Sequence, residues 1–140
     1  MSDAPTEIDA SMLLCDHAQS VGGKLYVLGG GWTQVKRDQW NGTLALAINI
    51  AVPWDRTNEP IRLRANLLTE DGEPVSMGNA PVQAEGNMEV GRPPGVRRGT
   101  PLGASVALNF QGLQLDPGGY VWELEVAGDV RERVAFQVVR

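Results

Sequence analysis

A cysteine, an aspartate and a histidine follow one another at positions 15–17, and a thiol beside an imidazole is a pair that nucleophilic enzymes use. In one continuous strand Cys15 and His17 would share a face, while Asp16 would point to the other side. Nucleophilic catalysis also needs an orienting third group and an oxyanion site, and the sequence offers neither. We therefore interpret Cys15 as a buried structural thiol beside a surface histidine, and we expect the protein not to be an enzyme.

Metal ligands are sparse, because the chain has one histidine and one cysteine, too few for structural zinc. Calcium prefers clustered oxygen ligands, and two acidic loops carry them. These loop residues are Asp55, Asn58 and Glu59 in the first loop, and Glu70, Asp71 and Glu73 in the second. The two loops would bind calcium if they converged at one end of a sandwich, but solvated turn residues are the preferred interpretation. We expect no cofactor.

Aromatic and basic side chains mark a candidate interaction surface. Trp54 follows Pro53 in a loop, where an aromatic ring can stack on a sugar or anchor a protein. The Pro- and Gly-rich segment 88–103 is locally basic, with three arginines against one glutamate, and such a loop can dock an acidic partner or a phosphate. Half-buried packing of the tryptophan and solvation of the arginines are the plainer interpretations. The predicted surface comprises Trp54, Asp55, Arg56, Arg92, Arg97 and Arg98.

Two groups of glycines near the start have different roles. Gly22 and Gly23 fit the tight turn of a hairpin whose second strand is Lys24–Leu28, because both tolerate positive φ. Gly29–Gly31 lacks the Gly-Lys-Ser/Thr ending and the following helix of a phosphate loop. We therefore predict a bulge there, after which Trp32–Lys36 resumes the strand.

Strict alternation of large with small or polar residues predicts the strands that position these loops. The clearest case is Leu44–Val52, and the pattern recurs in 61–67, 104–110, 120–126 and 134–138. Turn signals separate the runs, and no segment has a convincing helical period. The pattern predicts an all-β, immunoglobulin-like or C2-like antiparallel sandwich of about seven to eight strands. Residues 1–8 are expected to be a mobile tail, and residues 9–140 a single domain.

Composition narrows the class of protein. Of the 140 residues 17 are acidic and 12 basic, and the net charge of −5 disfavours binding to nucleic acid or an anionic membrane surface. A single cysteine allows no intrachain disulfide, and a reducing cytoplasm is the simplest interpretation. No apolar run approaches ~20 residues, so no membrane span is expected.

Three stretches together carry a resemblance to a known family. They are SMLLCDHAQSVGGKLYVLGGGW, LALAINIAVPWDRTNEPIRLRANLLTEDGEPV, and LQLDPGGYVWELEVAG followed by a closing FQVV. From about Ser11 to the end, the chain resembles a family of small uncharacterised bacterial proteins, frequent in high-GC actinobacteria and catalogued only as a domain of unknown function. The resemblance implies a β-sandwich of unknown role and lends no catalytic residues.

These observations lead to one functional hypothesis and an alternative. The leading hypothesis is a non-catalytic module that binds a protein partner or a second copy of itself. If apolar residues aligned on one outer face of the sheets, they would form a patch that needs a partner; they are Leu13, Leu28, Leu68, Val121 and Val139. The alternative is a sandwich that binds carbohydrate or, with calcium, lipid through the loop Val52–Glu59.

Overall fold

Two β-sheets form the framework of the computed structural model, which describes residues 7–140. The first sheet has the order β1–β5–β10, with β1 at Asp9–Cys15, β5 at Leu44–Val52 and β10 at Leu102–Phe110. The second sheet has the order β4–β12–β11–β6–β9, with β4 at Gln34–Lys36, β12 at Asp129–Val139, β11 at Gly118–Val126, β6 at Pro60–Thr69 and β9 at Gln83–Glu89. Neighbouring strands are antiparallel except β4 and β12, which run parallel.

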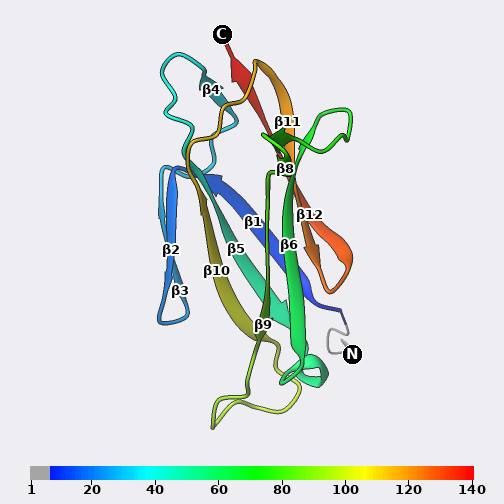
Figure 1. The fold of residues 1–140 in the computed structure, drawn as a ribbon. Helices are drawn as coiled ribbons and strands as arrows, with labels where there is room; N and C mark the ends of the chain where they lie inside the picture. Colours follow the sequence, from blue (N-terminus) through cyan, green and yellow to red (C-terminus); the bar gives the residue numbers. More distant parts are fainter. Residues whose placement is uncertain (1–6) are drawn as a thin grey trace, which may run out of the picture.

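The two sheets pack face to face because each supplies one apolar face (Figure 1). The large side chains of β5 all point into the core and are at most 1% exposed: Leu44, Leu46, Ile48, Ile50 and Val52. From the other sheet, β11 contributes Tyr120, Trp122 and Leu124 to the same core. Burying each of these side chains stabilises the fold by roughly 1.5–3 kcal/mol. The prediction of an all-β sandwich is therefore confirmed, and Trp122 is fully buried in its core.

One side of the sandwich is closed by β1, which contacts β12 of the opposite sheet. Met12 and Leu14 of β1 are buried there, and Ile8, just before the strand, is only 2% exposed in the same core. Residues 1–8 were predicted to be a tail. Residues 1–6 lie outside the described part of the chain, whereas Ile8 belongs to the packed core.

A β-hairpin adds a third layer over the outer face of β5 and β10. It consists of β2 (His17–Val21) and β3 (Lys24–Leu28), joined by Gly22 and Gly23 at φ +59° and +76°, so the predicted hairpin is confirmed. Ala18 on its inner face packs on the small side chains of Cys15, Ala45 and Ala47, and all four are at most 4% exposed. Ala45 and Ala47 of β5 are thus buried as well, since alanine leaves room for a second backbone to approach.

Two polar residues of β10 hold the hairpin in place. The side-chain amide of Asn109 accepts from the backbone N–H of Ala18 at 3.2 Å and donates to the carbonyl of the same residue at 2.8 Å. The hydroxyl of Ser20 donates to the carbonyl of Ser105 at 3.0 Å, and the two hydroxyls are 2.7 Å apart. The hairpin is therefore fastened to β10 along its length as well as packed on it.

Gly29–Gly31 leads the chain out of the hairpin and across to the second sheet. Gly29 has φ +61°, and a Cβ there would crowd the carboxylate of Asp16, so the position favours glycine. The prediction that Trp32–Lys36 resumes the same strand after a bulge is wrong. Residues 34–36 instead form β4, which pairs with β12 in the other sheet. The alternation beyond the glycines is real, but the sequence pattern does not reveal which sheet the strand joins.

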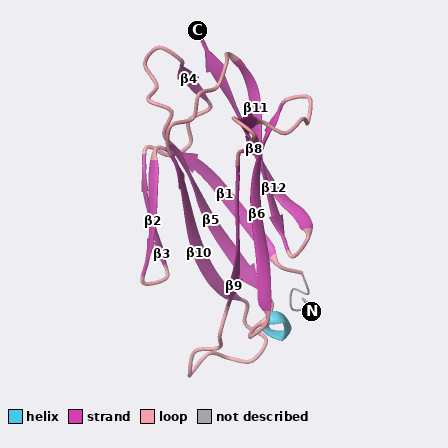
Figure 2. Cartoon of the chain, in the orientation of Figure 1, coloured by secondary structure: helices cyan, strands magenta, loops and turns pink. Residues whose placement is uncertain are grey.

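The two acidic loops lie at opposite ends of β6, so the prediction that they could converge on calcium is wrong. The first loop ends where this ten-residue strand begins, and the second starts where it ends. The first loop contains the 3-10 turn η1 (Trp54–Arg56), which Figure 2 shows at one end of the sandwich. The second loop leads to a small hairpin of β7 (Ser76–Met77) and β8 (Ala80–Pro81). These short strands help to bring the total to twelve in the described residues, above the predicted seven to eight.

The apolar residues that were expected to share one outer face are divided between two surfaces. Leu13 and Leu28 are exposed on the side of β1 and the hairpin. Leu68 and Val121 are cross-strand partners in the five-stranded sheet, and Val139 lies in the same sheet. The single apolar patch expected from the sequence therefore does not form.

Replacing Asn109 with alanine is expected to loosen the hairpin. The change removes both hydrogen bonds to Ala18, so the free energy of unfolding should fall by about 1–2 kcal/mol in urea titrations. The amide of Ala18 should also exchange its hydrogen faster, while the amides of β5 keep their protection. The matched control is Asn87→Ala on β9, because that exposed side chain makes no hydrogen bond within residues 7–140. Equal effects of the two changes would contradict this account.

Candidate functional site

Two loops meet at the end of the sandwich where η1 lies. Loop 53–59 and loop 90–101 are joined by the backbone N–H of Asn58, which donates to the carbonyl of Val90 at 2.7 Å. The guanidinium of Arg92 lies over the ring of Trp54 at 4.3 Å from its centroid. It also donates from Nη2 to the carbonyl of Trp54 at 2.8 Å and from Nε to the hydroxyl of Thr57. Thr57 is buried, so this contact anchors the second loop on the first.

The structure brings together only part of the predicted surface. Trp54 and Arg92 are in contact, and Asp55 and Arg56 share the η1 turn with the tryptophan. Arg56 is paired with Glu59 at 3.3 Å. Arg97 and Arg98 lie further along the second loop, exposed, and neither forms an ion pair within the described residues. Trp54 is half-buried and its ring is covered by Arg92, so this pair helps to build the loop framework.

A groove of about 630 Å³ lies beside this loop framework. It is lined by the tip of the β2–β3 hairpin, the segment that leaves β9 and the start of β10. The lining residues that matter below are Ser20, Glu89, Arg92 and Ala104. Arg92 therefore contributes both to the loop anchor and to the wall of the groove. The sequence did not single out this groove, because three segments distant in the sequence form it.

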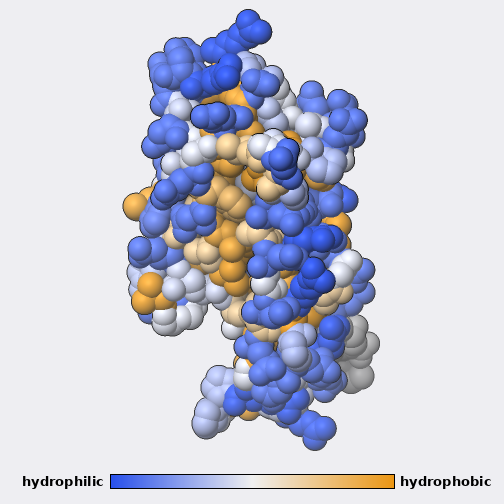
Figure 3. Space-filling view, in the orientation of Figure 1, coloured by the Kyte–Doolittle hydropathy of each residue, from blue (hydrophilic) through white to orange (hydrophobic). Residues whose placement is uncertain are grey.

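Next to the groove the sandwich core is incompletely covered between β9 and β10, and this stretch is called the opening below. The core-facing residues of β5 are buried, as is Leu102 at the start of β10. The four other cross-strand neighbours on β10 are only partly buried: Ala104, Val106, Leu108 and Phe110. The same contrast holds in the other sheet, where Ala65 of β6 is buried and its partner Ala84 of β9 is half-exposed. Figure 3 shows apolar surface gathered in a band along the middle of this face.

Both strands that border the opening have a free edge. Among the strands of residues 7–140, β10 is paired with β5 alone and β9 with β6 alone. Unpaired strand edges usually carry charges or prolines that prevent other chains from adding to them. β9 follows that rule with Glu85 and Glu89, whereas β10 has the uncharged sequence LGASVALNF. The edge of β10 is therefore available to another extended segment.

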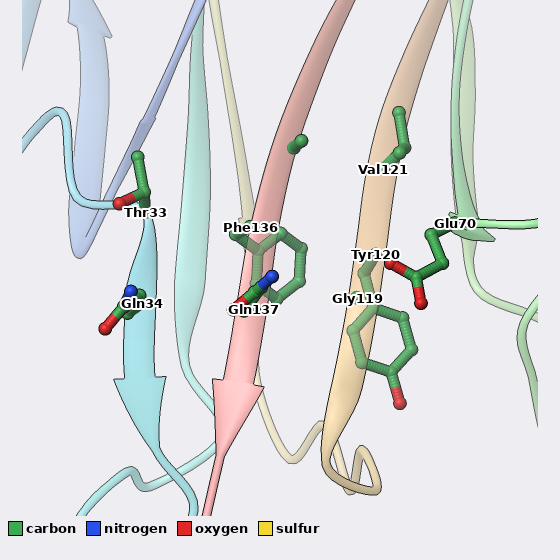
Figure 4. A pocket seen from close by; sticks show the side chains of 9 residues that line it. Thr33, Gln34, Glu70, Gly119, Tyr120, Val121, Phe136 and Gln137 are labelled. Carbon is green, nitrogen blue, oxygen red and sulfur yellow. The ribbon is translucent and has the colours of Figure 1, made fainter.

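A second hollow, of about 370 Å³, lies on the outer face of the five-stranded sheet (Figure 4). It exists because Gly119 has no side chain, and the carboxylate of Glu70 lies close to the space where a Cβ would be. Below it, the rings of Tyr120 and Phe136 are stacked with centroids 5.6 Å apart. Burial raises the pKa of Tyr120, whose hydroxyl donates to the carbonyl of Asp116. This hollow brings one carboxylate and two glutamines together, with no basic partner among its lining residues.

The Cys15–Asp16–His17 segment is not a catalytic pair. β1 ends at Cys15 and β2 begins at His17, so the chain bends at Asp16 and the two residues lie on different elements. Cys15 is fully buried under the hairpin with its thiol 3.5 Å from the carbonyl of Ala45, while His17 is exposed. Burial and the neighbouring Asp16 carboxylate raise the pKa of the thiol, which disfavours the reactive thiolate. The interpretation of Cys15 as a buried thiol is confirmed.

The other perturbed groups belong to ion pairs on the five-stranded sheet. Arg64 donates to Glu125 at 2.7 Å, and Asn66 donates to the same carboxylate oxygen at 2.9 Å. These hydrogen bonds lower the pKa of Glu125 and keep it ionised. Arg62 lowers the pKa of Glu85 in the same way. Within residues 7–140 no group of three or more His, Cys, Asp or Glu side chains is placed to hold a metal ion.

The sequence matches the family of unknown function DUF6941 over residues 10–139. The chain belongs to that family. The predicted resemblance to a domain of unknown function is thus confirmed, while the bacterial, actinobacterial-type origin stays a prediction. No curated protein matches the sequence. The matched region extends from β1 to β12, so it includes both loops, the groove and the opening. In the described residues, no helix is long and apolar enough to cross a membrane.

Replacing Arg92 with lysine is expected to destabilise the protein although the charge is kept. Lysine cannot donate to Trp54 and Thr57 at once with the fixed geometry of a guanidinium, and it stacks less well on the indole ring. The free energy of unfolding in urea should fall by about 1–2 kcal/mol. Arg98→Lys is the control, because Arg98 is exposed and unpaired in the described chain, and it should change stability little. An Arg92→Lys protein as stable as the control would show that the contact is not an anchor.

Cys15 is expected to resist thiol reagents in the folded protein. The thiol is fully buried and its pKa is raised, so labelling by a water-soluble disulfide reagent at pH 8 should wait for unfolding. The labelling rate should therefore rise with urea in parallel with the loss of the circular dichroism signal. Rapid labelling of the native protein would contradict the burial of Cys15 and reopen a catalytic interpretation.

Proposed function

We propose that this domain is a non-catalytic protein-interaction module that binds an extended segment of a partner protein along the opening between β9 and β10. The observation that carries the proposal is the incomplete cover of the core on this side. From Ala104 to Phe110 the core-facing residues of β10 are only partly buried, while those of β5 next to them are buried. The opposite side is closed by β1 against β12, so the opening is a local feature and not a general looseness of the sandwich.

A strand added at this opening would have two effects. Its backbone would pair with the free edge of β10, and its inward side chains would cover the apolar residues between the sheets. The indole N–H of Trp122, which is buried beside Phe110, has no acceptor within the described residues. Buried donors in proteins usually find an acceptor, which is consistent with an interior that an added segment completes.

Length and charge describe the expected segment. β10 has nine residues, so a strand of roughly 30 Å could pair along it. Its residues should alternate between apolar and polar, because every second side chain would face the core. Arg92, Arg97 and Arg98 lie in the loop that leads to the Leu102 end of β10 and have no carboxylate partner in the described chain. The segment should therefore carry Asp or Glu at that end.

The alternative, a carbohydrate or calcium-dependent lipid site in the loop Val52–Glu59, has less support. Arg92 covers the Trp54 ring that would stack on a sugar, and the second acidic loop lies at the far end of β6. We also propose a non-enzymatic role, since the one thiol is buried and its pKa is raised. A reducing compartment such as the cytoplasm suits that free thiol, and the acidic net charge argues against nucleic acid as partner.

The proposal predicts which peptides the domain selects. A displayed library of short random peptides, panned against the full chain, should yield sequences that alternate apolar with polar residues and end in acidic ones. Added to labelled protein, such a peptide should shift the amide resonances of β10 more than those of β12. Val106→Lys should weaken its binding by at least about tenfold, because the lysine stem would occupy the opening while its amine reaches water.

The matched control is Val121→Lys, since Val121 is also a half-buried valine but lies on the outer face of β11. It should change peptide affinity by less than about twofold, and urea unfolding of both variants checks that they fold. The double change of Arg97 and Arg98 to glutamate should reduce peptide affinity more at low salt than at high salt. Peptides without a common pattern, or shifts confined to other strands, would refute the proposal.

A further inference from the structure

The outward face of the β2–β3 hairpin is the most apolar exposed part of the described chain. Five large hydrophobic side chains are exposed among residues 7–140, and three of them lie on this hairpin: Val21 at 56%, Tyr26 at 54% and Leu28 at 66%. Tyr26 and Leu28 point outward because Leu25 and Val27, which alternate with them along β3, face the sheet beneath. The hairpin is anchored by Asn109 and Ser105, so this face is presented on a fixed element.

Charged groups lie at both ends of β3. Lys24 begins the strand, and the carboxylate of Asp16 lies against Gly29 just beyond its other end. Neither Lys24 nor Asp16 has an ion-pair partner in residues 7–140. The other basic side chain of the hairpin is that of His17, which is exposed and pairs with Leu28 across the hairpin, beside Asp16. The surface therefore carries a positive charge, an apolar centre and a negative charge in order.

We propose that this face binds the same face of a second copy of the chain, with the two β3 strands antiparallel across a two-fold axis at Tyr26. A surface with opposite charges at its two ends is complementary to itself when one copy is turned end for end. The axis at Tyr26 sets Lys24 opposite Leu28 of the second copy, within reach of Asp16 of that copy. Symmetry makes the same ion pair twice.

Repulsion elsewhere favours this site for self-association over the rest of the surface. Each chain carries a net charge of −5, so most contacts between two copies would set acidic residues against one another. The hairpin face avoids that, because its single acidic neighbour meets a lysine. The proposal is independent of the opening at β10, since it uses the outward side of the hairpin and the opening lies between the sheets.

The hairpin face is small, so the dimer is expected to be weak. Stable dimers usually bury about 800 Å² on each partner, and a two-stranded hairpin offers less, so a dissociation constant on the order of 100 μM is expected. Sedimentation velocity of the full chain between about 10 μM and 1 mM should then show a reversible monomer–dimer equilibrium. Tyr26→Asp should weaken association at least roughly tenfold, because the two introduced carboxylates would face one another at the axis.

The charge arrangement gives a sharper test. Lys24→Glu should weaken the dimer, because glutamate would face Asp16 of the second copy. Adding Asp16→Lys to that variant restores opposite charges across the axis and should bring the dissociation constant back to within about threefold of the original. The control is Val130→Asp, since Val130 is also an exposed apolar residue but lies on β12, and its dimer should be unchanged.

Each outcome decides the proposal. A dimer that the single changes at positions 24 and 26 weaken, and that the double change at positions 24 and 16 restores, supports it. A chain that stays monomeric at about 1 mM overturns it, as does a dimer that Tyr26→Asp leaves intact or that the double change fails to restore. Neither result bears on the opening, because the peptide experiments there use Val106 and are read from β10.

Discussion

Strand β5 is buried on one face along its whole length and on the other face at Ala45 and Ala47, and the rest of the structure depends on that constraint. Its leucines and isoleucines fill the core, while Ala45 and Ala47 on the other face are small enough to admit the hairpin. A register shift of one residue would exchange the two faces and fit neither neighbour. β1 and β10 pair with this strand on its two sides, so the register of the whole first sheet follows from it. The hairpin lies over the alanine face of β5. β10 lies beside β5 at the edge of the sheet, where the core is incompletely covered.

Much of the fold follows from alternation, because the period of two is a local property of the sequence. The strands at Leu44–Val52 and Gly118–Val126 were predictable, as was the turn at Gly22 and Gly23. What could not be predicted is which strands become neighbours. The three glycines at 29–31 look like a bulge in isolation, but they carry the chain to a parallel pairing with β12, more than 90 residues later. Pairing at that distance is set by packing of the whole chain and leaves no local signal.

The candidate site was likewise predictable only in part. The loop composition drew attention to Trp54 and Arg92, and these two residues do meet. Their contact anchors one loop on another, which composition alone could not distinguish from a binding role. The half-exposed core face of β10 was missed altogether, because its sequence alternates just as that of the buried β5 does. Only the order of strands in the sheets shows that β10 lies at an edge. The lack of any charged residue in LGASVALNF was the one available signal.

The contact of β1 with β12 has a consequence for how the protein is made. The strand that starts the sandwich is completed by the strand that ends it, and the two are synthesised about as far apart in time as the chain allows. Until β11 and β12 leave the ribosome, only β6 and β9 of the opposite sheet are available to cover the large residues of β5. The nascent chain must therefore carry an unfinished apolar sheet through most of its synthesis, a state in which a chaperone would find its binding surface.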